Sequence, residues 1–124
     1  MIRTLLFIGL GGGAGSIFRY LTSVVVTRYF QSVFPLAIFI VNVSGCFLIG
    51  LFLGLSERHP FANSDLKWLF ITGFCGGYTT FSTFSAENVG LVQSGHYLTA
   101  ALYAAASVLA GLGAVWIGLI LAKP

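Results

Sequence analysis

The sequence predicts an all-α integral membrane protein with four transmembrane helices and a break in the third. Of its 124 residues, 57% are hydrophobic and 7% are charged, whereas a soluble domain averages about 25% charged residues. A spanning helix needs about 20 apolar residues, and the chain offers four such stretches, at roughly 4–26, 35–56, 66–93 and 97–122. We therefore expect a single membrane domain, residues 1–124, embedded in the lipid bilayer.

The first stretch contains glycines at the spacing that lets two helices approach closely. Gly9 and Gly13 form one such pair, and Gly11 and Gly15 form a second. The same letters fit a loose dinucleotide-binding fingerprint, but no strand precedes them, so we expect no nucleotide site. Arg19 follows the glycines, and it could either snorkel to the membrane surface or face inward towards a vestibule.

The second stretch carries one strongly polar side chain, Asn42, followed by Ser44. A single buried Asn often joins two membrane helices through hydrogen bonds, and this is the interpretation that the stretch alone favours. The alternative is that its amide N–H groups face a permeating anion. Gly50 and Gly54 supply a second close-packing face.

The third stretch is too long for one straight crossing, and its centre is not built for lipid. Gly76 and Gly77 lower helix propensity and are expected to divide it into two half-helices. A break at membrane depth frees backbone N–H and C=O groups, which are tolerated only inside protein or along a polar cavity. Such breaks hold ions in transporters and channels. Five hydroxyl residues surround this one: Thr79, Thr80, Ser82, Thr83 and Ser85.

Two phenylalanines and one carboxylate follow the break. Phe81 and Phe84 are three residues apart and are expected to be neighbours on a helix surface. Because the edge of an aromatic ring carries partial positive charge, rings beside hydroxyl groups suit a small dehydrated anion better than a cation. Glu87 is the carboxylate inside the spans, and we expect its partner to be Asn42 or water near a pore mouth.

The fourth stretch is rich in alanine and glycine, which predicts a closely packed helix. Tyr103 and Ser107 lie four residues apart and so on one face of that helix. Interhelical hydrogen bonds are the interpretation that the stretch alone favours for both.

The charges give little information on orientation and exclude some function classes. Four basic residues fall on the side of the two termini (Arg3, Arg58, Lys67 and Lys123), and two fall on or near the other side (Arg19 and Arg28). So small an excess permits insertion both ways round. The basic residues form no cluster with aromatics, so we expect no nucleic acid partner. We expect the protein not to be an enzyme, because the sequence lacks a combination of residues suited to catalysis. The candidates are two loop histidines, one carboxylate inside the spans and two isolated cysteines, Cys46 and Cys75.

The run from Gly76 to Phe84, Gly-Gly-Tyr-Thr-Thr-Phe-Ser-Thr-Phe, resembles the signature of the small bacterial fluoride channels, the Fluc or CrcB family. The resemblance covers essentially the whole chain, including the glycine-rich first span with Arg19 and the Val-Asn-Val-Ser-Gly run of the second span. It implies an antiparallel, dual-topology homodimer with two fluoride pores in the bacterial inner membrane. Tyr78 departs from the apolar residue common at its position in that family.

The resemblance also implies roles for particular residues. The carbonyls of Gly76 and Thr79, from both subunits, would hold a central structural sodium ion. Arg19 and Glu87 would lie towards the vestibules. The remaining candidates would line the pore: Asn42, Phe81, Ser82, Thr83, Phe84, Tyr103 and Ser107. For Asn42 this implication replaces the helix-joining role that the stretch alone favours.

The function implied is passive, fluoride-selective export that protects the cell from fluoride toxicity. A small four-span drug–proton antiporter is the alternative from the transport class, but it would need a carboxylate in its first span, and none is present. A purely structural assembly subunit would explain the glycines but not the hydroxyls and phenylalanines around the helix break.

Overall fold

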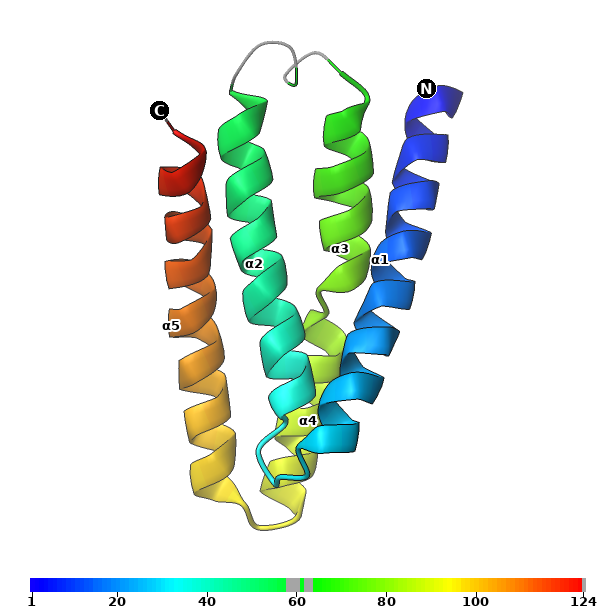
Figure 1. The fold of residues 1–124 in the computed structure, drawn as a ribbon. Helices are drawn as coiled ribbons and strands as arrows, with labels where there is room; N and C mark the ends of the chain where they lie inside the picture. The colour runs from blue at the N-terminus through cyan, green and yellow to red at the C-terminus, as the bar shows by residue number, and fades with distance from the viewer. Residues whose placement is uncertain (58–60, 62–63, 124) are drawn as a thin grey trace.

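The computed structural model describes residues 1–57, 61 and 64–123. Arg58, counted above on the side of the two termini, and His59, one of the two loop histidines, therefore lie outside the described residues. Within these ranges the fold is entirely helical, which confirms the predicted class. Figure 1 shows four crossings side by side, the third made of consecutive segments. The elements are α1 (Ile2–Tyr29), α2 (Leu36–Ser56), the π-helical η2 (Trp68–Cys75), α3 (Gly76–Tyr78), α4 (Phe81–Gln93) and α5 (Tyr97–Ala122).

Successive crossings run in opposite directions, and the two termini lie at the same end of the bundle (Figure 1). Among the described residues, α1, α2 and α5 are each long and apolar enough to span a membrane alone. The third crossing reaches a comparable length only by adding η2, α3 and α4 together. The chain is therefore a multi-pass membrane protein.

The third crossing breaks at Thr79 and Thr80, not at the glycines as predicted. Thr79 has φ −77° and ψ 156°, and Thr80 has φ −151° and ψ 116°; both are extended. Gly76 keeps helical angles, φ −64° and ψ −38°, and Gly77 lies inside α3. Extended backbone suits β-branched threonine, and Thr80 begins the next helix as its N-cap. The break at Thr79 and Thr80 therefore lies three residues further along the chain than the predicted break at Gly76 and Gly77.

The glycines of the third crossing have different surroundings. A Cβ at Gly77 would meet the carbonyl oxygen of Gly12, so the two backbones touch there. A Cβ at Gly76 would meet nothing within 4 Å. Gly77 therefore serves close packing of α3 on α1, while Gly76 faces open space.

Close packing of α1 involves one of its two predicted glycine pairs. A Cβ at Gly11 would meet the backbone of Leu69, and one at Gly15 would meet the backbone of Phe74. Gly9 and Gly13 have nothing within 4 Å on their side of the helix. α1 thus lies against η2 and α3 along the face marked by Gly11 and Gly15.

The other side of the bundle is α2 packed along α5. Gly50 of α2 faces the backbone of Val115, and Gly54 faces Ala122. Gly118 of α5 faces the backbone of Phe47 in return. Since α4 also packs on α5, the two halves of the third crossing lie against different helices.

Replacing Gly77 with alanine should destabilise the protein. The added Cβ would meet a backbone oxygen, which cannot rotate away, and overpacking of this kind costs about 1–3 kcal/mol. We expect a lower Tm for G77A in detergent, measured by scanning fluorimetry. G13A is the matched control because its Cβ enters open space, and an equal Tm for both variants would contradict the close approach.

Candidate functional site

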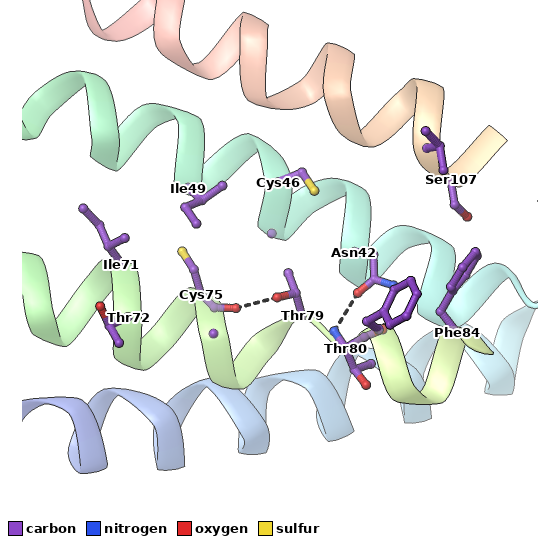
Figure 2. Close-up of a pocket in the computed structure, with 14 residues that line it drawn as sticks. Asn42, Cys46, Ile49, Ile71, Thr72, Cys75, Thr79, Thr80, Phe84 and Ser107 are labelled. Atoms are coloured by element: carbon purple, nitrogen blue, oxygen red, sulfur yellow. Dashed lines mark hydrogen bonds between the residues drawn. The ribbon is translucent and has the colours of Figure 1, made fainter. Parts of the chain in front are cut away.

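A pair of hydrogen bonds from Asn42 holds the break in the third crossing. The Oδ1 atom of Asn42 accepts from the backbone N–H of Thr80 at 2.8 Å, and its Nδ2 donates to the carbonyl of Thr80 at 3.1 Å. Figure 2 shows the first of these bonds crossing from α2 to the break. Asn42 therefore has the helix-joining role that its stretch alone favoured. Because a primary amide has two N–H donors, one N–H is left for a further partner.

The hydroxyl of Thr80 caps α4. Its Oγ1 accepts from the backbone N–H of Thr83 at 3.2 Å and donates to Thr83 Oγ1 at 3.1 Å. Ser82 Oγ lies 3.2 Å from the same oxygen. The predicted pore hydroxyls Ser82 and Thr83 are thus joined through Thr80, which was not among the predicted site residues. A signal for Thr80 was present in the sequence, since Thr is a preferred N-cap residue.

Backbone carbonyls lose their helical donors at the break, and those of Gly76 and Thr79 are among them. In an unbroken α-helix the amide of Thr80 would donate to Gly76 and that of Thr83 to Thr79. Here the first donates to Asn42 and the second to the Thr80 hydroxyl. The carbonyls of Gly76 and Thr79, the predicted cation ligands, are therefore among those that lose their helical donors at the break.

Free carbonyl oxygens suit a hard cation, which takes six or more oxygen ligands in the case of Ca²⁺. Among the described residues no group of three His, Cys, Asp or Glu side chains gathers to form a metal site. A cation at this break would therefore rely on main-chain oxygens. Since the predicted ligands from one chain are two carbonyls, the other ligands would have to come from water or from a second chain.

A groove of about 550 Å³ lies beside the break, between α2, the third crossing and α5 (Figure 2). The groove brings together six of the eleven predicted site residues: Asn42, Gly76, Thr79, Phe81, Phe84 and Ser107. Most of the remaining residues that line it are apolar or carry a thiol.

The two phenylalanines are neighbours at one end of this groove, as their spacing predicted. Their ring centroids lie 5.7 Å apart. Phe84 also packs on Tyr103, with centroids 5.0 Å apart, whereas Phe81 is 79% exposed. One ring is therefore fixed by the bundle, and the other projects from its surface.

Glu87 has a different partner from the one expected. Its Oε2 accepts a hydrogen bond from the hydroxyl of Tyr103 at 2.7 Å, while Asn42 is engaged with Thr80. The predicted pairing of Glu87 with Asn42 is wrong, because Glu87 bonds to Tyr103 of α5 and Asn42 bonds to the backbone of Thr80. Tyr103 is fully buried and makes an interhelical bond, as its stretch alone favoured.

Ser107, one turn further along α5, is the exception among the polar side chains. Its Oγ is buried and has no hydrogen-bond partner in the described part of the chain, and it lies at the groove (Figure 2). An unpaired buried hydroxyl costs about 1–3 kcal/mol. It is therefore available to a ligand in the groove.

Tyr78 has polar partners. Its hydroxyl lies 3.0 Å from Ser44 Oγ and 3.5 Å from Thr22 Oγ1, and its ring stacks on Phe74 at 5.8 Å. This pairing was not predicted, although the hydroxyls of Thr22 and Ser44 in two other apolar spans are possible partners for a tyrosine hydroxyl. Tyr78 ties α3 to both α1 and α2.

Known proteins similar to this chain cover nearly its whole length. A family model described as "CrcB-like protein, Camphor Resistance (CrcB)" matches residues 6–119. A protein of Flavobacterium psychrophilum named "Fluoride-specific ion channel FluC" is 52% identical over 122 residues, 98% of each chain. A protein of the same name from Azobacteroides pseudotrichonymphae is 45% identical over 123 residues, 99% of this chain and 98% of its own.

These relatives are named as ion channels, not enzymes, which confirms the expectation of a non-enzymatic protein. The family match also confirms the resemblance drawn from the Gly76–Phe84 run. The chain belongs to the CrcB-like family.

Proposed function

We propose that the protein is a fluoride-selective ion channel that mediates passive fluoride efflux across the bacterial inner membrane. The observation that carries the proposal is the 52% identity, over 98% of both chains, to a relative named as a fluoride-specific ion channel. The geometry of the groove supports it, because the groove combines aromatic rings and neutral hydrogen-bond donors. A channel of this kind protects the cell without an energy source, since a membrane potential that is negative inside drives an anion outward.

The groove offers fluoride replacements for its hydration shell. The free N–H of Asn42 and the unpaired hydroxyl of Ser107 are donors without charge. The edges of Phe81 and Phe84 add partial positive charge, and the positive end of the α4 dipole begins at Phe81. The attraction between an anion and a neutral donor falls more steeply with distance than the attraction between an anion and a fixed cation. Neutral donors therefore stabilise a dehydrated anion without trapping it.

The proposed assembly is a homodimer of antiparallel chains in dual topology, with two separate pores. Its support is the open side of the groove, where Gly76 and the Phe81 ring face outward from the single chain. A second chain placed there would enclose the groove, and two-fold symmetry would then produce two enclosed grooves. The weak charge bias between the two sides permits both orientations.

The carbonyls of Gly76 and Thr79 would hold a structural sodium ion between the two chains. Both lack their helical donors, and Gly76 faces open space. Four carbonyls, two from each chain, would surround the ion. Its positive charge would stabilise the carbonyl ends that meet where the chains join.

Purified protein in liposomes should release fluoride when a potential is applied and should retain chloride. The expected selectivity follows from neutral donors and ring edges in the groove that match a small anion. Fluoride- and chloride-selective electrodes measure both fluxes on the same preparation, with empty liposomes as the baseline. Comparable chloride flux would refute the fluoride selectivity.

Replacing Phe81 or Phe84 with isoleucine should slow fluoride release at least about tenfold, the effect of losing about 1.4 kcal/mol of stabilisation along the path. The variants should elute as wild type from a size-exclusion column, because isoleucine preserves most of the apolar volume. F30I is a matched control, since Phe30 is 60% exposed and lies beyond the end of α1. Wild-type rates in F81I and F84I would remove these rings from the mechanism.

A further inference from the structure

One face of α1 presents polar side chains to the broken crossing. Ser16 Oγ donates to the carbonyl of Gly77 at 3.4 Å, and Arg19 Nη1 donates to the carbonyl of Thr79 at 3.4 Å. The two donors are three residues apart and so lie on the same face. α1 therefore supplies donors to carbonyls that the break exposes.

Arg19 differs from the other donor in carrying a full charge at a half-buried position. A guanidinium inside a membrane span is costly and is usually paired. The ion pair found among the described residues joins Arg3 to Asp65, at the end of the bundle. Arg19 instead meets a main-chain carbonyl, whose negative end attracts any cation.

That carbonyl is one of the two proposed for the structural sodium ion. Its helical donor is lost, because the amide of Thr83 donates to the Thr80 hydroxyl. At 3.4 Å its bond to Arg19 is at the long limit for a hydrogen bond. A hydrogen bond of this length is weak, so a ligand that binds the Thr79 oxygen more strongly can replace it.

We propose that Arg19 is a tethered cation that competes with the structural sodium ion for the Thr79 carbonyl. In the separate chain its guanidinium donates a hydrogen bond to the carbonyl oxygen of Thr79. In the assembled channel it lies beside the bound ion, where repulsion between like charges lowers the affinity of the site. Arg19 thereby sets the sodium concentration at which the assembly becomes stable. The inference rests on the proposed sodium site and deepens it.

The test measures the Tm of the purified protein in detergent against sodium concentration, with N-methyl-D-glucamine replacing sodium at constant ionic strength. R19Q removes the charge and keeps an amide donor. We expect its half-maximal stabilisation at about tenfold less sodium than wild type, the effect of removing about 1.4 kcal/mol of repulsion from the site. R28Q is the matched control, since it removes an equal charge from the exposed end of the same helix; its sodium dependence should match wild type.

The outcomes separate this inference from the proposed function. A wild-type protein whose Tm does not respond to sodium would overturn the sodium site itself. A wild-type response with an unchanged or weaker sodium affinity in R19Q would overturn only the competition. An R28Q shift equal to that of R19Q would assign the effect to net charge and not to the Thr79 carbonyl, which also overturns it.

R19H tests the same point if R19Q fails to fold, because one folded protein can then be measured with and without the charge. An unperturbed histidine titrates near pH 6.5, so its charge is present at low pH and absent at high pH. We expect R19H to need less sodium at pH 8.5 than at pH 5.5, while wild type changes little between the two. An identical sodium dependence of R19H at both pH values would contradict the competition.

Discussion

The two hydrogen bonds between Asn42 and the backbone of Thr80 are the constraint on which the rest of the site depends. A broken helix in a membrane exposes N–H and C=O groups that lipid cannot satisfy. A side-chain amide presents the same donor and acceptor as a peptide, so Asn42 stands in for the missing turn at Thr80. By taking the Thr80 amide it also withholds that donor from Gly76. The same interaction therefore stabilises the break and creates a free carbonyl beside it.

The position of the break follows from packing on both sides. The half before it, η2 and α3, lies on α1, where Gly77 touches Gly12. The half after it, α4, lies on α5, where Glu87 accepts from Tyr103. A straight helix could not follow both neighbours. Two extended threonines let the chain change partners, and the Thr80 hydroxyl then restarts the helix at once. The groove lies where these two packing regions meet.

The sequence predicted the helical class, because a bilayer leaves an apolar chain almost no other choice. It also placed Phe81 beside Phe84, since spacing along one helix fixes which residues are neighbours. It misplaced the break, because glycine propensity says where a helix is weak and not where tertiary contacts hold it together. It missed the partner of Glu87 for a related reason: spacing gives the face of a residue but not the helix opposite that face.

The groups left without partners are as informative as those that are paired. Most buried polar groups in a folded protein are hydrogen-bonded, and the network around Thr80 shows that this chain satisfies them readily where it can. In the described part of the chain, the buried Ser107 hydroxyl has no hydrogen-bond partner and the Gly76 carbonyl has lost its helical donor; both residues line the groove. One is a donor for an anion and the other an acceptor for a cation. The second chain and the ions of the proposed function would supply partners for these two groups.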